Sequence, residues 1–524
     1  MSIFFKKNKN KNKRLTNITP PYEKPVLNTK YMGQKGYTIM KNELTEQQIE
    51  HIKKSLTVKP FMPGAPVNNA KAFYVYRESP SKLYVPRYFG INEFGPPKEN
   101  KLTNGDKIGT NLTFSGSLRP AQIPAASSYL NSVTNGGSAL LELPCGFGKT
   151  ALGIYIISQL RTKTLIIVHK EFLLNQWIER INDFLPGARV GRIQGNTIDV
   201  ENKDIVIGML QSLTQREYDQ SIINTFGLTI IDEVHHISAE CFSQSLFKIV
   251  TKYMLGLTAT LTRKDGTTGV IRMFLGDVAY SEKRKGDDAV LVRGVRYTTN
   301  DKVFNENLLD YRGNPQYSTM ITKLCNFNAR TECILNLLKD MLEQEPNKQI
   351  MVLAQNKSIL KYIFDAINHR NIGTCGYYIG GMKETALKES EGKQVIVATY
   401  SMAAEGLDIK TLTKLIMATP RSDIEQAVGR ILRDKHANPI VVDIIDTHDV
   451  FQNQWKKRKR FYKSQKYKIV EIESNLYSGI TNSPWKTTFS GEKGTIKNQV
   501  INSDDDSDGE EGDTGEKKPN KCRV

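Results

Sequence analysis

Short, uninterrupted apolar runs of three to five residues recur along two long blocks of the chain, at about 113–290 and 326–475. Runs that are apolar at every position are typical of parallel strands whose sheet is covered by helices on both faces. We therefore expect each block to form a doubly wound α/β lobe with a mostly parallel sheet. The expected strands are Ala139–Leu143, Leu165–Val168, Ile205–Ile207, Leu228–Ile231 and Met254–Leu257 in the first lobe, and Ile350–Leu353, Gly376–Ile379, Val395–Ala398, Leu415–Met417 and Ile440–Ile444 in the second.

A smaller α+β unit precedes the two blocks. We expect a helix at Thr45–Lys54 with Thr45 as its N-cap, and strands at Thr57–Val58, Ala72–Tyr76 and Lys82–Val85. The aromatic and cationic residues of this unit suit both a packed core and nucleic-acid contacts, and core packing is slightly favoured. They are Arg77, Lys82, Tyr84, Arg87, Tyr88 and Phe89.

These patterns divide the chain into six parts. They are a disordered basic arm (1–30), an accessory unit with nucleic-acid-binding character (31–112), a first lobe (113–296), a connector (297–325), a second lobe (326–475) and an acidic disordered tail (476–524).

The run Ala139–Leu143 leads into Pro-Cys-Gly-Phe-Gly-Lys-Thr and then into a helical segment. A strand, a glycine turn and a helix that begins at Lys-Thr can cradle a polyphosphate, because glycine admits close approach and the first N–H groups of the helix point at the ligand. Lys149 is expected to reach the β- and γ-phosphates, and Thr150 to hold Mg²⁺. Leu143 stands where the usual phosphate loop has its first glycine, so the motif alone does not decide the function.

Two carboxylates follow the strand Leu228–Ile231 in the segment Asp-Glu-Val-His. Hydrolysis of a nucleoside triphosphate requires one carboxylate beside Mg²⁺ and another that orients or deprotonates water. We assign the first role to Asp232 and the second to Glu233. His235 is expected to couple this site to the other lobe.

Hydroxyl and small residues at other strand ends form the next group of candidates. Thr258 and Thr260 are expected to relay hydrogen bonds from the carboxylates towards the cleft between the lobes. In the second lobe, Thr399 is expected to contact a nucleic-acid phosphate, while Gly406 and Asp408 approach the nucleotide across the cleft.

A helix of the second lobe carries Gln426, Arg430 and Arg433 close together on one face. Two arginines that face a nucleoside triphosphate from a separate lobe are what an arginine-finger mechanism requires. An ordinary helix with surface arginines would explain the segment if it stood alone.

Composition narrows the class of protein. The formal net charge of +18 favours a polyanionic partner, either nucleic acid or an acidic membrane surface. No apolar run reaches eighteen residues, so we expect no membrane span. The six cysteines form no C-x-x-C pair, which predicts free thiols in a reducing, intracellular compartment and neither disulfides nor a zinc site.

Taken together, the motifs over about 113–470 resemble the superfamily-two helicases and translocases of the DExH type, which have two RecA-like lobes. The resemblance implies roles for matching residues: Arg119 and Gln122 on the adenine side; Gly146, Phe147, Gly148, Lys149 and Thr150 in the phosphate loop; Asp232 and Glu233 in catalysis, with His235, Thr258 and Thr260 in coupling; His169, Gln176, Gln211 and Thr399 towards nucleic acid; and Gly406, Asp408, Gln426, Arg430 and Arg433 at the nucleotide from the second lobe.

Within this superfamily, the segments Leu-Pro-Cys-Gly and Leu-Thr-Ala-Thr-Leu-Thr-Arg-Lys-Asp resemble the branch of the transcription-factor-IIH translocase. The segment from Lys82 to Gly90 resembles transcript-release or repair helicases of large DNA viruses. The resemblance implies ATP and Mg²⁺ as cofactors, movement on DNA rather than RNA in the 3′ to 5′ direction, and transcription or repair machinery as candidate partners. An RNA-directed helicase, a non-unwinding motor subunit and a non-catalytic scaffold are the alternatives.

Overall fold

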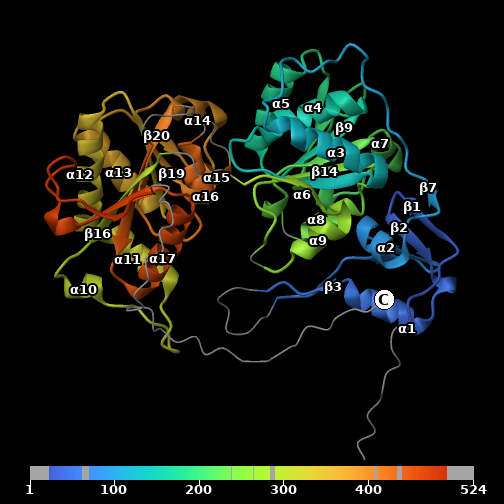
Figure 1. The fold of residues 1–524 in the computed structure, drawn as a ribbon, viewed down its shortest axis with the longest axis horizontal. Coiled ribbons are helices and arrows are strands. Elements are labelled where there is room, and N and C mark those ends of the chain that lie inside the picture. Colours follow the sequence, from blue (N-terminus) through green and yellow to red (C-terminus); the bar gives the residue numbers. More distant parts are fainter. Residues whose placement is uncertain are drawn as a thin grey trace, which may run out of the picture.

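The computed structural model describes residues 23–61, 70–237, 239–263, 265–283, 289–405, 409, 411–432 and 439–491, with the side chains at 135, 404 and 405 excepted. Figure 1 shows two lobes side by side, the first in cyan to green and the second in yellow to red, with a smaller blue unit against the first lobe. Among the described residues, no helix is long and apolar enough to cross a membrane.

The first lobe is a doubly wound α/β layer structure. Its strands are β8 (Ser138–Glu142), β9 (Thr164–Val168), β10 (Val190–Gln194), β11 (Thr197–Ile198), β12 (Ile205–Met209), β13 (Leu228–Ile231), β14 (Tyr253–Thr258) and β15 (Val278–Ser281). Its helices are α3 (Gln122–Gly136), α4 (Lys149–Leu160), α5 (Glu171–Phe184), α6 (Leu210–Gln215), α7 (Gln220–Asn224), α8 (Ala239–Leu246) and α9 (Thr268–Leu275).

The strand order in this sheet is β11-β10-β12-β9-β13-β14-β8-β15, and the pairing is parallel except between β10 and β11. Neighbouring residues of one strand enter different cores: Leu140 packs with α8 and α9, and Leu141 packs with α3 and α4. Helices thus cover both faces of the sheet (Figure 1). This arrangement explains the uninterrupted apolar runs and confirms the predicted fold class.

The second lobe repeats this architecture. Its strands are β16 (Leu291–Tyr297), β17 (Gln349–Ala354), β18 (Cys375–Tyr378), β19 (Val395–Thr399), β20 (Leu412–Met417), β21 (Ile440–Asp446), β22 (Lys468–Glu473) and β23 (Lys486–Phe489). Its helices are α10 (Lys302–Asn305), α11 (Tyr317–Asn326), α12 (Asn328–Gln344), α13 (Lys357–His369), α14 (Glu384–Glu391), α15 (Tyr400–Glu405), α16 (Glu425–Arg430) and α17 (Asp449–Ser464). The sheet order is β18-β19-β17-β20-β21-β16-β22-β23, with an antiparallel pair only at β22 and β23.

The start and end of the second sheet differ from the boundaries expected from the sequence. Strand β16 pairs with β21 and β22, so Leu291 to Arg296 belong to the second sheet although the expected first lobe ran to 296. In the expected connector, Met320 and Leu324 of α11 are buried in the second-lobe core. Strand β23 extends this sheet beyond 475.

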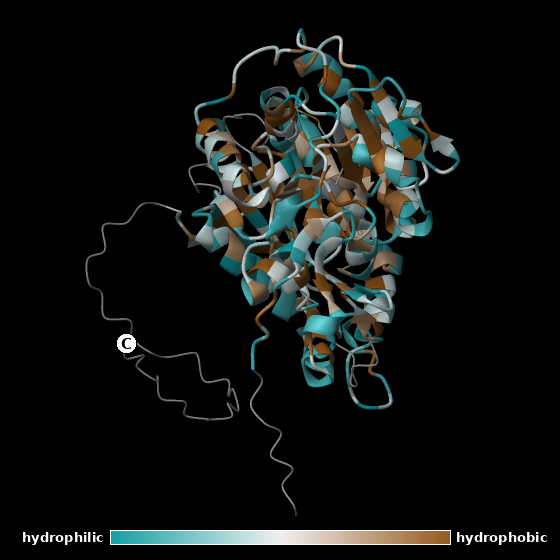
Figure 2. Cartoon of the chain, turned by 90° about the vertical axis from the view of Figure 1, so that its right-hand side faces the viewer, coloured by the Kyte–Doolittle hydropathy of each residue, from teal (hydrophilic) through white to brown (hydrophobic). Residues whose placement is uncertain are grey.

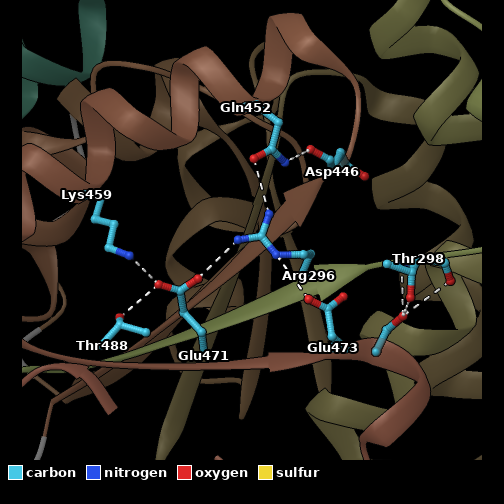
Figure 3. A network of polar contacts seen from close by, with 9 residues as sticks. Arg296, Thr298, Asp446, Gln452, Lys459, Glu471, Glu473 and Thr488 are labelled. Atoms are coloured by element: carbon cyan, nitrogen blue, oxygen red, sulfur yellow. Dashed lines mark hydrogen bonds and ion pairs between the residues drawn. The ribbon is translucent and has the colours of Figure 1, made fainter. Parts of the chain in front are cut away.

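Strand β16 was not predicted from the apolar pattern because it carries charged residues. Arg296 contacts Glu471 and Glu473 of β22, each at 3.2 Å, and Gln452 of α17 at 3.2 Å. Figure 3 shows Lys459 and Thr488 completing this polar network around Glu471, at 2.6 and 2.8 Å. Ion pairs therefore join β16 to its neighbours at positions where an apolar run would be expected.

The amino-terminal unit contains a five-stranded sheet of order β5-β6-β2-β1-β7 and a separate β3-β4 pair. Its elements are β1 (Lys30–Gly33), β2 (Gly36–Met40), α1 (Glu46–Ser55), β3 (Thr57–Val58), β4 (Phe73–Tyr74), β5 (Arg77–Glu78), β6 (Lys82–Val85), α2 (Arg87–Phe94) and β7 (Glu99–Asn100). Thr45 caps α1 in a capping box with Gln48, which confirms the predicted helix start.

Arg87 and Tyr88, two of the cationic and aromatic residues named in the sequence analysis, hold this unit against the first lobe. Arg87 is 5 % exposed and donates to the carbonyls of Thr251 at 2.6 Å and Lys252 at 3.2 Å. The Tyr88 hydroxyl donates to the Ser138 carbonyl at 2.6 Å. These two residues are structural. Figure 2 shows hydrophobic segments concentrated in the interior and hydrophilic segments towards the outside.

Candidate nucleotide site between the lobes

The phosphate loop begins only after Leu143, the position at which the usual pattern has its first glycine. Leu143 is fully buried, and its N–H donates to the Thr258 carbonyl of β14 at 2.8 Å. The chain turns only at Gly146 and Gly148, whose φ angles are +80° and +86°. Position 143 is therefore an extension of the buried strand, where leucine suits better than glycine.

Two side chains support the backbone of this loop from α3 and the segment before it. Gln122 donates to the carbonyls of Phe147 at 2.9 Å and Gly148 at 3.2 Å, and Arg119 donates to the Gly146 carbonyl at 3.1 Å. A Cβ on Gly148 would lie only 2.6–2.7 Å from nitrogens of these side chains. The Phe147 side chain itself is buried in the first-lobe core, so this residue contributes its backbone to the loop.

A lysine and two carboxylates meet beside the loop. Lys149 Nζ lies 2.7 Å from Glu233 Oε1, and both side chains are largely buried. Asp232 accepts a hydrogen bond from the Trp177 indole at 2.9 Å. Glu233 has φ +47°, a left-handed conformation that is uncommon for a residue with a side chain. Such strain is often retained where a side chain must point into a functional site.

Burial and charge separate the pKa values of the two carboxyls. Burial raises the pKa of Asp232, and the negative charge of Glu233 raises it further against the opposing effect of Lys149. Burial also acts to raise the pKa of Glu233, but the Lys149 ammonium together with His235 and His236 outweighs it, and the pKa is lowered. Glu233 is therefore the carboxylate that stays ionised most readily, which suits a group that acts on water.

These groups line a cavity of about 390 Å³ that both lobes share. The first lobe contributes Arg119, Gln122, Gly146, Gly148, Lys149, Thr150, Asp232 and Glu233, and the second lobe contributes Arg430. Arg430 is 5 % exposed at the end of α16. A cavity with a buried lysine, a glycine loop and an arginine from a second lobe is suited to a nucleoside polyphosphate.

Helix α5 supplies one wall of the cavity, which the sequence did not predict. Leu173, Gln176 and Arg180 recur at helical spacing and line the cavity together with Phe184. Gln176 therefore lies at the nucleotide cavity, which differs from the nucleic-acid contact predicted for it. Phe184 stacks on Phe114 with ring centres 5.4 Å apart, and no motif marks either residue.

A chain of hydrogen bonds crosses from the second lobe to the first. The Gln426 amide nitrogen lies 3.0 Å from His235 Nε2, and His235 Nδ1 lies 2.8 Å from the Thr258 hydroxyl. The Thr258 hydroxyl donates to the Thr260 carbonyl at 2.7 Å. Donation by Gln426 leaves Nδ1 as the protonated nitrogen of a neutral His235. Burial accordingly lowers the pKa of His235 to about 4, although Glu233 opposes this shift.

The lobes touch closely at the phosphate loop. A Cβ on Gly429 of α16 would lie 3.2 Å from Cys145 Cβ, so a glycine there permits α16 to approach the loop. On the rim, Lys388 of α14 lies 2.6 Å from Glu179 of α5. These contacts belong to a conformation in which the cavity is bounded by both lobes.

Other predicted residues lie at strand ends of the two sheets. Gln211 donates to the His169 carbonyl at 3.2 Å, which brings the ends of β9 and β12 together. Thr399 ends β19, and its hydroxyl lies 3.3 Å from that of Ser401. The predicted residues Gly406, Asp408 and Arg433 lie outside the described residues.

The predicted Mg²⁺ site would need ligands from the bound phosphates in addition to those of the protein. Within the part of the chain that the structure describes, no group of three or more His, Cys, Asp or Glu could hold a metal ion. Thr150 and Asp232 line the same cavity. A hydroxyl and one carboxylate fit Mg²⁺ that is bound together with phosphate oxygens, because this ion keeps few protein ligands.

Comparisons with known proteins give matches over most of the chain. The family described as "Type III restriction enzyme, res subunit" matches residues 115–263, and "Helicase conserved C-terminal domain" matches residues 332–435. The chain is 36% identical to "Putative ATP-dependent RNA helicase L396" of Acanthamoeba polyphaga mimivirus over 83% of this chain and 85% of that protein. It is 25% identical to "Putative helicase 161L" of Invertebrate iridescent virus 6, over 80% and 96%. The crystal structure of T4 UvsW aligns with 82% of this chain and 96% of its own, at 17% identity and a TM-score of 0.31.

Proposed function

Because this chain belongs to the superfamily-two helicases, and is thus an ATP-dependent helicase, we propose that its interlobe cavity binds ATP with Mg²⁺ and that hydrolysis moves the lobes along nucleic acid. The observation that carries the proposal is the joint cavity, in which Arg430 of the second lobe faces Lys149 and Glu233 of the first.

The roles follow from the positions of the side chains. Lys149 and the N–H groups at the start of α4 hold the phosphates, while Thr150 and Asp232 hold Mg²⁺. When bound, Mg²⁺ neutralises charge that develops on the phosphate oxygens. Glu233 accepts a proton from the attacking water, and Arg430 stabilises the transferred phosphoryl group when the lobes are closed.

The ion pair between Lys149 and Glu233 makes activation of water follow the binding of ATP. At 2.7 Å, each group neutralises the other. Phosphates that draw Lys149 towards themselves release Glu233, whose carboxylate is then available to water. Binding of ATP thereby prepares the general base as well as the electrophile.

Nucleic acid would run across both lobes past His169, Gln211 and Thr399, held mainly by phosphate contacts. We favour DNA as the polymer, with movement in the 3′ to 5′ direction and a role in transcript release or repair, because the chain shares motifs with the branch of the transcription-factor-IIH translocase. The names of the viral relatives support RNA as the second candidate polymer.

Lys149→Ala tests the nucleotide assignment. We expect nucleic-acid-stimulated ATP hydrolysis to fall by at least about 100-fold, because a buried phosphate-binding charge is removed. The control is Lys361→Ala, which removes an exposed lysine of α13 in an ion pair with Asp365. Hydrolysis at the normal rate in Lys149→Ala would refute the proposed site.

A panel of substrates tests the polymer and the pathway. ATPase and strand-displacement assays with DNA, RNA and hybrid duplexes that carry defined overhangs would show which strand stimulates the enzyme. We expect DNA with a 3′ overhang to be the best substrate. Preference for RNA would support the second candidate, and stimulation without strand displacement would indicate a non-unwinding motor.

A further inference from the structure

The segment from Lys82 to Tyr88 of the amino-terminal unit, which carries cationic and aromatic residues, divides into two halves. Arg87 and Tyr88 point into the first lobe and are used in docking. Lys82 and Tyr84, on β6, have buried neighbours in Leu83 and Val85 but stay partly exposed themselves. The two-lobed site makes no use of this outer half.

Strand register places the outer residues in one row. Tyr31 of β1 pairs with Thr38 of β2, which in turn pairs with Tyr84 of β6. The opposite face of the sheet is covered by α2, where a Cβ on Gly90 would collide with the Tyr37 ring. Because successive side chains of a strand point to opposite faces, the row lies on the face away from α2.

Three lysines stand over the two tyrosine rings of this row. The Nζ atoms of Lys101 and Lys82 lie 4.4 and 5.7 Å from the ring centre of Tyr31, and Nζ of Lys35 lies 5.4 Å from that of Tyr84. Lys82 also donates to the Tyr31 hydroxyl at 3.1 Å. Cation–π contacts position the ammonium groups without neutralising their charge.

The surrounding charge is also positive. The segment 23–112 contains 14 Lys or Arg and eight Asp or Glu. In the row itself, Glu99 is the register partner of Tyr31 and lies 3.1 Å from Lys101. Lys35 and Lys82 keep their charge on the tyrosine rings. An array of positioned cations on a flat sheet complements a regularly spaced polyanion.

We propose that this lysine–tyrosine face, made of Tyr31, Lys35, Lys82, Tyr84 and Lys101, binds the phosphate backbone of the nucleic acid on which the lobes act. The proposal rests on the proposed function, since it takes the substrate of the motor as its occupant. Lysine binds phosphate as a point charge, so the face adds affinity without sequence preference.

The test is the triple variant Lys35→Gln, Lys82→Gln, Lys101→Gln in the full chain without nucleotide. Binding to single-stranded and duplex DNA and RNA oligonucleotides is measured by fluorescence anisotropy over a series of salt concentrations. We expect affinity to fall roughly tenfold and the slope of log affinity against log salt to become shallower by about 2, because up to three phosphate contacts are lost.

Two further variants separate charge from folding. Replacement of the same three lysines by arginine should leave affinity and slope as in the wild type. Removal of three exposed lysines elsewhere, with Lys339→Gln, Lys348→Gln, Lys361→Gln, changes the net charge equally and should leave the slope unchanged. Affinity and slope of the first variant equal to those of the wild type, or an equal loss in this control, would overturn the proposal.

The experiments distinguish failure of the proposed lysine–tyrosine face from failure of the proposed motor function. With saturating nucleic acid, the triple glutamine variant should hydrolyse ATP at the wild-type rate. Wild-type protein that binds nucleic acid without stimulated hydrolysis would refute the motor, while the comparison of affinities would still decide the face. The DNA and RNA probes show which polymer the face holds.

Discussion

The two lobes share one fold but differ in what their buried charges contact. In the first lobe, Lys149 and Glu233 lie in a cavity, and Glu233 Oε2 accepts no hydrogen bond from the described residues. In the second lobe, Arg330 and Asp446 are fully enclosed and form two hydrogen bonds, at 2.5 and 2.7 Å. The first pair faces space that a ligand can fill, whereas the second pair is complete within the protein.

A second enclosed pair shows the same arrangement. Arg458 of α17 donates twice to Asp443 of β21, at 2.8 and 2.9 Å, and the Tyr462 hydroxyl donates to the same carboxylate at 2.9 Å. Arg458 thus ties α17 to β21, and Arg330 ties α12 to the same strand. Repetition of an apolar pattern therefore produces a repeated lobe, while the placement of charge at the cavity decides which lobe is suited to a nucleotide.

We expect Arg430→Ala to have the largest effect, because it removes a charge that the second lobe contributes to the cavity. We expect kcat for ATP hydrolysis to fall by about 10³–10⁵-fold. Binding of a fluorescent ATP analogue should change little. The control Arg370→Ala breaks an exposed ion pair with Glu332 and should leave kcat near normal. An unaltered kcat in Arg430→Ala would show that Arg430 encloses the cavity but does not take part in hydrolysis.

Arg330→Ala tests the structural role of enclosed charge. Because Asp446 would be left buried without its partner, we expect the second lobe to lose about 3–5 kcal/mol of unfolding free energy in denaturant titrations. Replacement of both partners, with Arg330→Met and Asp446→Leu, should recover most of this loss. Nucleotide affinity of the first lobe should be retained at low denaturant. Equal losses in the single and double variants would show that the ion pair itself is needed.

The contact between His235 and Gln426 joins the two lobes, and a double-mutant cycle tests whether it also couples them. With His235→Ala, Gln426→Ala and the combination, we expect a coupling free energy of about 1 kcal/mol in kcat. The exposed rim pair Lys388 and Glu179 provides the comparison and should couple less strongly. Additive losses at His235 and Gln426 would indicate that the lobes communicate by another route.

The pH dependence of the unfolding free energy provides the last test. The pKa of His235 is lowered to about 4, below the ordinary value of 6.5, so stability that is present above about 6.5 is lost as the pH falls towards about 4. Glu233, Lys149, His236 and His169 face this ring and are kept unchanged in the comparison. His235→Gln stays neutral and should lose less stability than the wild type over this range. Parallel stability curves would contradict a buried, neutral His235.

The sequence was sufficient for the fold wherever strands are buried on both faces. Strand β13 was predicted to the residue, β9 begins one residue earlier than predicted, and β8 is displaced by one residue at both ends. Strand β16 was missed because Arg293 and Arg296 interrupt its apolar pattern, and the partners of Arg296 come from distant segments. A window of sequence cannot show that the charge of Arg296 will be neutralised by Glu471, which lies 175 positions away.

The candidate site divides in the same way. Lys149, Asp232 and Arg430 could be predicted because spacing and strand ends fix their positions. Phe114 and Phe184 could not, since stacked rings from two loosely patterned segments leave no local signal. Gln176 was expected to contact nucleic acid, but helical spacing with Leu173 and Arg180 turns it towards the nucleotide cavity.

The docking of the amino-terminal unit has one further consequence. Because Arg87 and Tyr88 bond to backbone carbonyls of the first lobe, the unit is attached to that lobe. If the second lobe moves away after hydrolysis, as the proposed function requires, the lysine–tyrosine face stays with the phosphate loop. Nucleic acid held on this face would not dissociate while the second lobe is open. Arg87 would therefore contribute to the processivity of the enzyme, although it contacts neither the nucleotide nor the nucleic acid.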